Sequence, residues 1–250
     1  MNGRDELDLA TRAARQAGAM LREAMRRDKQ VLSATGRDIK LQADRDAEAV
    51  ILDVLRDSQF NVLAEESGEH GALDGGAPFW IVDPLDGTMN FSRGIPLCCV
   101  SIALSRIGEP ILGVIYDFNM DELYTGIVGE GAWLNGEAMA VSGIDDASKA
   151  VLATGFPVNF AYDEAGLQAY LAMVTRFKKV RKFGTAALSL AYVACGRADA
   201  YAEDDIMFWD VAAGVALVKA AGGYARVAPS PTLKWARRVR CASRERIWEP

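Results

Sequence analysis

The spacing of apolar residues changes along this 250-residue chain, and the changes limit the folds open to it. Between residues 7 and 56, apolar side chains recur at helical spacing, which predicts helices at 7–25 and 44–56. Between residues 60 and 134, the apolar runs are short and bounded by Gly, Pro or Asp, which is typical of strands. We expect these strands at 60–64, 79–82, 98–104, 111–116, 122–126 and 131–134, with a turn at Asn135-Gly136.

Beyond residue 150, segments of the two kinds alternate. The pattern predicts strands at 150–154, 180–183, 198–202 and 223–227, and helices at 163–177, 185–195 and 209–221. Such alternation favours a sheet covered by helices. A polar stretch rich in small residues, 142–150, marks the expected boundary between an N-terminal half, 1–145, and a C-terminal half, 146–250. We expect the two halves to share a cleft.

The composition disfavours two classes of partner. The 28 Lys and Arg residues against 34 Asp and Glu residues give a net charge of −6, and the basic residues are scattered, so we expect no nucleic-acid partner. No apolar run approaches the ~20 residues that span a bilayer. The first residues, MNGRDELDLATRA, lack the cationic and then apolar pattern of a signal peptide. We therefore expect a cytoplasmic protein with no membrane association.

Cysteine and histidine usage narrows the possible chemistry. The four cysteines show no CxxC spacing, and Cys98 and Cys99 lie inside an apolar run, so reduced structural thiols are favoured over a zinc or redox site. The one histidine, His70, lies in the Gly-rich segment ESGEHGALDGG, where we expect a solvated loop. A Ser/His/Asp triad, a multi-histidine zinc site or a phosphohistidine relay would have to depend on that single residue.

Acidic side chains follow two of the predicted strands. Glu65 and Glu66 come directly after FNVLA, and Asp83 and Asp86 come directly after FWIV. Ligands tend to bind at strand ends in folds of sheets and helices. If the two strands are neighbours, the four carboxylates converge, and their mutual repulsion would require cations. Hard oxygen ligands at this density suit Mg²⁺ or Mn²⁺.

Gly87 and Thr88 would add an anion site to this carboxylate cluster. If a helix or tight turn starts at Asp86, their backbone amides are free to bind a phosphate. Carboxylates beside phosphate-binding amides indicate metal-assisted phosphoryl transfer or hydrolysis. The alternative is that Asp83 and Asp86 only cap a helix and shape a turn. Asp210, in FWDVAAG, could likewise be a helix N-terminal charge.

Two phosphate-binding loops known from nucleotide enzymes do not occur in the chain. The sequence contains neither GxxxxGK[ST] nor a GxGxxG between strand and helix. Nucleotide hydrolysis by those routes is therefore disfavoured.

Four segments taken together resemble one known family. AEESGE, WIVDPLDGTMNF, GEGAWLNGE and FWDVAAG resemble the inositol monophosphatase family, the lithium-sensitive, magnesium-dependent phosphomonoesterases. The resemblance runs over nearly the whole chain, from the region of Asp44 to RRVRCAS. It implies a hydrolase with an α+β fold, a layered α/β/α/β/α sandwich whose two mixed or antiparallel sheets are covered by helices, assembled as a homodimer.

The resemblance also implies roles for individual residues. One Mg²⁺ would lower the pKa of a bound water, which Thr88, hydrogen-bonded to Asp44, would orient and deprotonate, with Glu65 as the third catalytic residue. A second Mg²⁺ would stabilise the leaving alkoxide, and a third, weaker cation would associate with Glu65. Mn²⁺ is a possible substitute. The implied metal ligands are Glu65, Asp83, Leu85 through its carbonyl, Asp86 and Asp210, and Glu66 would lie one shell further out.

The implied substrate is small and phosphorylated: inositol monophosphate or a similar polyol or sugar phosphate. Glu203 could accept hydrogen bonds from vicinal hydroxyls, or could be only a solvated acid at a strand end. Relatives with the same metal core cleave fructose 1,6-bisphosphate, histidinol phosphate or 3'-phosphoadenosine 5'-phosphate. A further alternative is a catalytically silent relative that binds a phosphorylated ligand or acts as a scaffold. The positions that match substrate contacts are Gly87, Thr88, Gly184, Thr185, Ala186 and Glu203.

Two further sets of residues bear on the substrate and on the third cation. A bisphosphate substrate would need a second cationic pocket, for which the candidates are Lys178, Lys179, Arg181 and Lys182. Ser33 stands where the family often has a loop lysine, and DIKL, residues 38–41, replaces the common D-x-V-T. These two departures concern the third cation and leave the two main ion sites intact.

Overall fold

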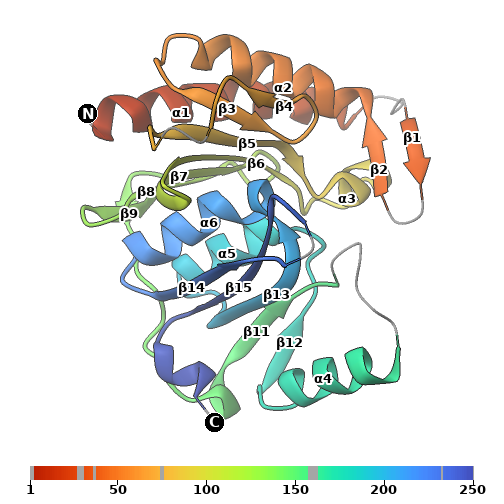
Figure 1. Ribbon diagram of the computed structural model, residues 1–250, viewed down its shortest axis with the longest axis vertical. Helices are drawn as coiled ribbons and strands as arrows, with labels where there is room; N and C mark the ends of the chain where they lie inside the picture. Colours follow the sequence, from red (N-terminus) through yellow and green to blue (C-terminus); the bar gives the residue numbers. More distant parts are fainter. Residues whose placement is uncertain are drawn as a thin grey trace.

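The computed structural model describes residues 3–26, 31–35, 38–73, 76–156, 163–231 and 233–249, and no side chains between 31 and 40. These residues stack in layers: a helix pair, a large sheet, a second helix pair, a smaller sheet and an outer helix (Figure 1). The expected α+β class and layered sandwich are therefore confirmed.

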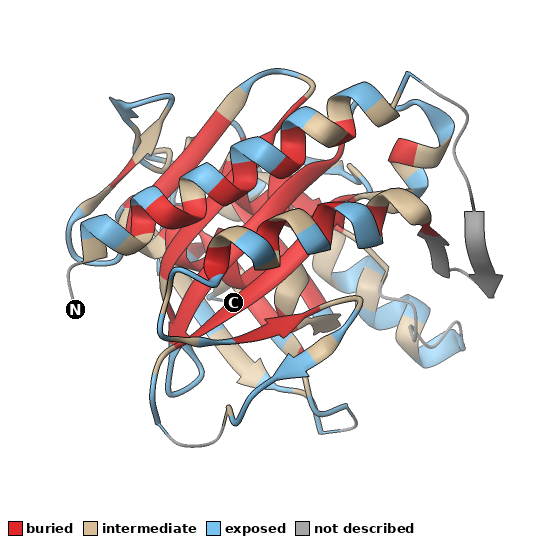
Figure 2. Ribbon diagram, turned by 90° about the horizontal axis from the view of Figure 1, so that it is seen from above, coloured by how far each residue is buried: buried red, intermediate tan, exposed pale blue. Residues whose placement is uncertain are grey.

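The first layer consists of α1 (Gly3–Ala24) and α2 (Gln42–Leu55), which pack against each other and cover one face of the large sheet. Both helices carry a buried stripe toward the sheet and an exposed stripe on the outside (Figure 2). In α1 the stripe follows the predicted spacing through Leu9, Ala13, Ala17 and Leu21, all buried. An apolar stripe of this kind is what attaches an amphipathic helix to a core.

The large sheet has eight strands over the described residues, in the order β10-β9-β8-β7-β6-β5-β3-β4. Its neighbours pair antiparallel, with one exception: β3 and β5 run parallel, with Ala64 opposite Val82. The carboxyl ends of these two strands therefore lie side by side. The strands are β3 (Asn61–Ala64), β4 (Gly68–His70), β5 (Phe79–Asp86), β6 (Cys99–Arg106), β7 (Glu109–Asp117), β8 (Glu122–Ile127), β9 (Gly131–Leu134) and β10 (Glu137–Ala138).

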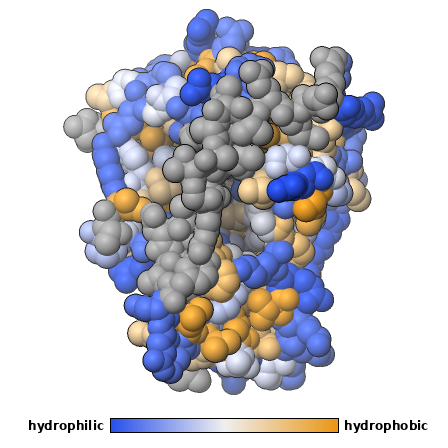
Figure 3. Space-filling view, turned by 90° about the vertical axis from the view of Figure 1, so that its right-hand side faces the viewer, coloured by the Kyte–Doolittle hydropathy of each residue, from blue (hydrophilic) through white to orange (hydrophobic). Residues whose placement is uncertain are grey.

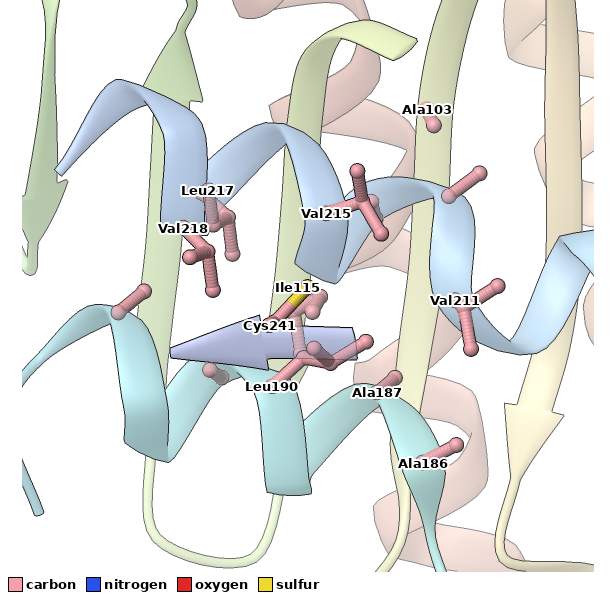
Figure 4. Packing of buried hydrophobic residues seen from close by; sticks show 14 of the residues in the cluster. Ala103, Ile115, Ala186, Ala187, Leu190, Val211, Val215, Leu217, Val218 and Cys241 are labelled. Atoms are coloured by element: carbon pink, nitrogen blue, oxygen red, sulfur yellow. The ribbon is translucent and has the colours of Figure 1, made fainter. Parts of the chain in front are cut away.

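The second sheet has five strands over the described residues, in the order β12-β11-β13-β15-β14. The helices α5 (Ala186–Ala194) and α6 (Phe208–Ala220) lie between the two sheets and are buried on nearly all sides. Leu190 of α5, Val215 of α6 and Ile115 of β7 belong to this central core (Figure 4). The strands are β11 (Val151–Thr154), β12 (Lys179–Arg181), β13 (Ala200–Met207), β14 (Tyr224–Pro229) and β15 (Ala236–Ala242).

The cysteines behave as the sequence predicts. All four thiols are free, and Cys98, Cys99 and Cys241 are buried. Cys241 lies among aliphatic side chains of the central core (Figure 4). Burial raises the pKa of the Cys241 thiol to about 12, so it stays protonated and acts as a small apolar side chain.

Several short elements were not predicted from the sequence. They are β1 (Val31–Thr35), β2 (Asp38–Leu41), β4, β10 and the 3₁₀ helices at Ala147–Lys149 and Glu245–Trp248. The short helix α3 (Thr88–Arg93) lies where the sequence indicated a helix or a tight turn. The expectation of a loop at His70 is wrong, because this residue ends β4 and pairs with Val62 of β3. Its side chain is exposed, as expected, and its Nε2 lies 2.6 Å from the hydroxyl of Ser67.

α4 (Glu164–Val174) lies outside the second sheet and carries no buried residue. Residues 139–150 connect the last strand of the large sheet to the first strand of the second. No helix in the described part of the chain is both long and apolar enough to cross a bilayer.

Two hairpin turns use the left-handed conformation at both central residues. The predicted turn at Asn135-Gly136 is confirmed, with φ of 50° and 85°. The turn between β6 and β7 has the same signs at Ile107 and Gly108, with φ of 54° and 75°. Asn and Gly tolerate this conformation, whereas a β-branched side chain is strained in it.

Replacing Ile107 with Asn should raise the free energy of unfolding by about 1 kcal/mol, because the left-handed conformation costs roughly that much at an L-residue with a bulky side chain. The Ile107 side chain is 77% exposed, so little apolar burial is lost. Urea unfolding measures the change. Ile95→Asn, at an exposed position outside the left-handed region, is the matched control and should bring no gain. Equal or lower stability of Ile107→Asn would contradict the assignment of strain.

Candidate active site

The acidic end of β5 is the centre of the site. Asp83 and Asp86 lie inside this fully buried strand, so the expectation that they follow the strand is wrong. The pairing with β6 shifts register between them and resumes at Asp86. Pro84 contributes to the irregularity because it has no N–H for the ladder. Asp83 Oδ1 accepts a hydrogen bond from the N–H of Leu85 at 3.0 Å, which fixes the carboxylate within the bulge.

Glu65 and Asp210 come to Asp83 from two other elements. Glu65 follows β3, and its N–H donates to the carbonyl of Val82 at 3.1 Å, so the parallel pairing of β3 with β5 continues to this residue. Asp210 lies in the first turn of α6. Burial, followed by the charges of Glu65, Asp86 and Asp210, raises the pKa of Asp83 well above its usual range. Burial, followed by the charges of Glu65, Asp86 and Glu203, raises the pKa of Asp210 well above its usual range.

These carboxylates have the chemistry of a cation site. Within the described residues, no ion pair joins Asp83, Asp86 or Asp210 to Lys or Arg. Buried like charges without a counter-charge are costly, and oxygen donors suit hard divalent ions. Among the residues described, no three acidic, His or Cys side chains already form a metal-ligand group. The fit to Mg²⁺ therefore rests on the chemistry of the donor set, which supplies carboxylate oxygens.

Asp86 is held by the start of α5. The hydroxyl of Thr185 and the N–H of Ala187 both donate to Asp86 Oδ2, the latter at 2.6 Å. Burial raises the pKa of Asp86 to about 6, while these hydrogen bonds lower it. Thr185 was predicted to contact substrate, and the structure shows that it orients Asp86.

Thr88 and Asp44 lie in contact, as the family resemblance implies. The hydroxyl of Thr88 has two acceptors, Asp44 Oδ1 at 3.1 Å and the carbonyl of Leu85 at 3.0 Å. Asp44 Oδ2 accepts the N–H of Leu41 at 2.7 Å. Burial raises the pKa of Asp44 to about 6, against these hydrogen bonds. The pair connects α2 to the carboxyl end of β5.

Gly87 makes the turn that presents Thr88. Its φ is 93°, and a Cβ here would lie 2.8 Å from the carbonyl oxygen of Leu97. A glycine is therefore required both by conformation and by space. Gly87 precedes the short helix α3, which begins at Thr88, so the expectation of a helix or tight turn starting at Asp86 is close to what is observed.

Asn90 connects this turn to the other half of the chain. Its side-chain NH₂ donates to the carbonyls of Leu97 at 2.7 Å and Phe183 at 2.8 Å. Phe183 immediately precedes the Gly184-Thr185 segment. Asn90 lies within the segment WIVDPLDGTMNF, but nothing in the sequence indicates its contact with Phe183, 93 residues later.

A cavity of about 450 Å³ opens beside these residues. The face of the molecule in Figure 3 is hollowed at mid-height. Six sequence-predicted residues line the cavity, namely Asp86, Gly184, Thr185, Ala186, Glu203 and Asp210. Lys182, one of the candidates for a second cationic pocket, also lines it, and the lining residues that sequence reasoning missed are Thr154, Gly155, Phe156, Ser189 and Ile206.

Glu203 is buried in the wall of this cavity, so the alternative of a solvated acid at a strand end is wrong. The hydroxyl of Tyr201 donates to its Oε2 at 2.9 Å. Burial raises the pKa of Glu203 to about 7, while Tyr201 and the charge of Lys182 lower it. A Cβ at Gly155 would lie 2.6 Å from the Glu203 carboxylate, so Gly155 leaves room for it.

Lys182 is the basic residue that lines the cavity. Its Nζ lies 3.4 Å from the centre of the Phe156 ring. Of the four residues considered for a second cationic pocket, Lys178, Lys179 and Arg181 do not line this cavity.

The Ser33 side chain lies outside the described residues, as do those of residues 38–40 in DIKL. Glu66 donates its N–H to Glu48 Oε2 at 2.9 Å.

Comparison with known proteins gives consistent results. The model of the inositol monophosphatase family matches residues 4–248. The protein named Nus factor SuhB from Xylella fastidiosa is 41% identical over 223 residues, covering 87% of this chain and 80% of that one. The inositol-1-monophosphatase of Synechocystis sp. is 40% identical over 229 residues, covering 87% of this chain and 77% of that one.

A solved structure shares the fold. The inositol monophosphatase from Anabaena (Nostoc) sp. superposes with a TM-score of 0.82 at 39% identity, covering 99% of this chain and 94% of that one. The family model extends over both sheets and over every element that carries the site. The chain therefore belongs to the inositol monophosphatase family.

Proposed function

We propose that this protein is a Mg²⁺-dependent phosphomonoesterase that hydrolyses inositol monophosphate or a similar polyol or sugar phosphate. The observation that carries the proposal is the meeting of Glu65, Asp83, Asp86 and Asp210 beside a cavity of about 450 Å³. A phosphate ester brings the kind of anion that bound cations would attract.

The proposed ion sites share Asp83. Glu65, Asp83 and the Leu85 carbonyl would hold one Mg²⁺, and Asp83, Asp86 and Asp210 would hold a second. A third ion at Glu65 and replacement by Mn²⁺ belong to the same proposal. Bound cations supply two kinds of chemistry: they lower the pKa of water toward ~7 and they stabilise negative charge on oxygen.

The chain's own groups have separate tasks in this proposal. Thr88 Oγ1 directs the attacking water and passes its proton to Asp44 Oδ1, which lies 3.1 Å away. The backbone amides of Gly87 and Thr88 bind the phosphate oxygens. Thr185 and the Ala187 N–H keep Asp86 oriented through their hydrogen bonds. The His70 side chain, exposed on β4, has no part in the reaction.

Glu203 is proposed to bind the alcohol of the substrate. Glu203→Gln should raise KM for inositol 1-phosphate about tenfold or more with a smaller change in kcat, because a hydrogen bond to a charged group contributes roughly 1.5–3 kcal/mol. Steady-state kinetics measure both constants. The matched control is p-nitrophenyl phosphate, which has no vicinal hydroxyls and should show little change. An equal loss on both substrates would contradict a role in alcohol binding.

A second candidate substrate class is favoured by Lys182. A cationic side chain in an otherwise acidic cavity suits an alcohol with a second anionic group, as in fructose 1,6-bisphosphate or 3'-phosphoadenosine 5'-phosphate. Phosphate release should be compared for these two compounds, histidinol phosphate and inositol 1-phosphate. Preference for inositol 1-phosphate supports the first proposal, preference for a bisphosphate supports the second, and no release from any would refute the enzyme.

The remaining proposals concern inhibition and assembly. We propose inhibition by lithium, a homodimer and a cytoplasmic location. Some relatives are named as a Nus factor rather than as an enzyme, and that name applies to those proteins. For this chain, with its net charge of −6, we propose no nucleic-acid partner.

A further inference from the structure

A second cavity of about 580 Å³ lies on the outer face of the second sheet, on the side away from α5 and α6. Its floor is a row across three strands: Ala202 of β13 is opposite Arg240 of β15, and Arg240 is opposite Arg226 of β14. Met173 of α4 and Trp248 of the C-terminal 3₁₀ helix also line it. The active cavity is adjacent, since Thr154, Gly155 and Glu203 line both.

The charges in this second cavity are unbalanced. Arg240 forms a two-pronged ion pair with Asp204, with distances of 2.7 and 3.0 Å. Arg176 donates to the backbone carbonyls of Ile247 and Glu249, which bind its N–H groups without cancelling its charge. No hydrogen bond or ion pair joins Arg226 to another described residue. The Glu203 carboxylate accepts a hydrogen bond from the hydroxyl of Tyr201, a residue of the central core. Three guanidinium groups, those of Arg176, Arg226 and Arg240, thus share this cavity with two carboxylates, those of Asp204 and Glu203.

Two features of this cavity point to an anionic occupant. Arg226 and Arg240 stand directly opposite each other on adjacent strands, an arrangement that is unfavourable for like charges unless an anion lies between them. The guanidinium group of Arg176 is fixed by the backbone carbonyls of Ile247 and Glu249, so its position is set before any ligand arrives. Preorganised guanidinium groups bind carboxylate and phosphate oxygens strongly.

The remaining walls define the body of the ligand. Tyr170, Met173 and Trp248 present aromatic and thioether surfaces beside the arginines. The ring centroids of Tyr170 and Phe156 lie 4.4 Å apart. Because Phe156 lines the active cavity, Tyr170 packs beside the rim of that cavity. A volume of about 580 Å³ is in the range of sites for small organic molecules.

We propose that this outer-face cavity is a second binding site, specific for a small organic anion with an aromatic body. The acid group of the ligand binds the guanidinium group of Arg226 and lies between those of Arg176 and Arg240. The aromatic body of the ligand packs against Met173 and Trp248. The site is separate from the carboxylate cluster, and its existence does not depend on the phosphatase activity.

Calorimetric titration of the full chain with phenylphosphonate, in buffer with a chelator, tests the site without turnover. We expect saturable one-to-one binding that weakens at least tenfold in Arg226→Gln. Arg106→Gln, which removes an exposed arginine on the large sheet, should leave the affinity unchanged, and so should Asp83→Asn in the active site. Benzyl alcohol, which has no acid group, should bind at least tenfold more weakly.

Three results would overturn the proposal: no saturable binding by the unsubstituted protein, equal affinity in Arg226→Gln, or an altered affinity in Asp83→Asn, which would place the ligand in the active cavity. Arg226→Gln should keep its thermal transition and its basal phosphatase activity, because Arg226 is exposed and belongs neither to the hydrophobic clusters nor to the lining of the active cavity. If no phosphatase activity exists, the binding experiment still decides the question.

Discussion

Replacing Asp83 with Asn should reduce turnover by at least ~1000-fold, equivalent to about 4 kcal/mol of transition-state stabilisation. Asp83 is the one residue shared by both proposed ion sites. Asn is isosteric and can still accept the Leu85 N–H through its Oδ1, so the bulge in β5 should persist. Circular dichroism and the rate of phosphate release measure the two parts of this expectation. Turnover near that of the unsubstituted protein would refute the two-ion assignment.

The same variant should have the opposite effect on stability when cations are removed. The Asp83 carboxylate is buried beside Glu65, Asp86 and Asp210, so removing its charge relieves repulsion in the folded state. In chelator, we expect Asp83→Asn to unfold at higher urea concentration than the unsubstituted protein, by on the order of 1 kcal/mol. Added Mg²⁺ should stabilise the unsubstituted protein and should stabilise the variant much less, because a ligand stabilises the state that binds it.

Asp8→Asn is the matched control, since it removes an exposed acid from the outer face of α1. It should change neither the turnover nor the response to Mg²⁺. If Asp83→Asn and Asp8→Asn respond equally to Mg²⁺, the cation does not bind at the carboxylate cluster.

Replacing Thr88 with Ala should lower kcat by roughly 100- to 10,000-fold, the usual range for loss of a positioned proton-transfer group. The hydroxyl lies between Asp44 and the Leu85 carbonyl, and Ala removes it without disturbing the backbone. Mg²⁺ affinity by calorimetry should change little, because the hydroxyl is not one of the proposed ligands. Thr88→Ser keeps the hydroxyl and should retain most of the activity.

Two outcomes would contradict this role for Thr88. A collapse of Mg²⁺ affinity in Thr88→Ala would show that the residue supports the ion site. Equal losses in Thr88→Ala and Thr88→Ser would show that the methyl group, and not the hydroxyl, matters.

The sequence predicted the elements whose apolar pattern is long and regular. The stripe of α1, the runs of β5 to β8 and the alternation after residue 150 are local signals, and the structure confirms them within a few residues. The acids after β3 and those near the end of β5 could be placed together because the apolar runs before them are visible in the sequence, although β5 itself extends through Asp86. Their parallel pairing was a condition of that inference, and the register of Ala64 with Val82 satisfies it.

Contacts between distant segments could not be predicted in the same way. Asp86 is oriented by Thr185, 99 residues later, and Glu203 is placed by the end of β11 at Gly155. Short elements such as α3 and β4 carry too few residues for a periodic pattern. Arg176, Arg226 and Arg240 converge only because α4 and two strands pack together, and their spacing along the chain gives no sign of it.

The most direct test of the central claim is the initial rate of phosphate release from inositol 1-phosphate, measured against Mg²⁺ concentration from a chelated start. The two-ion carboxylate site predicts no release in chelator, a saturable rise with Mg²⁺, and no rise for Asp83→Asn over the same range. A rate that is independent of chelator and Mg²⁺, or a Mg²⁺ response preserved in Asp83→Asn, would contradict it.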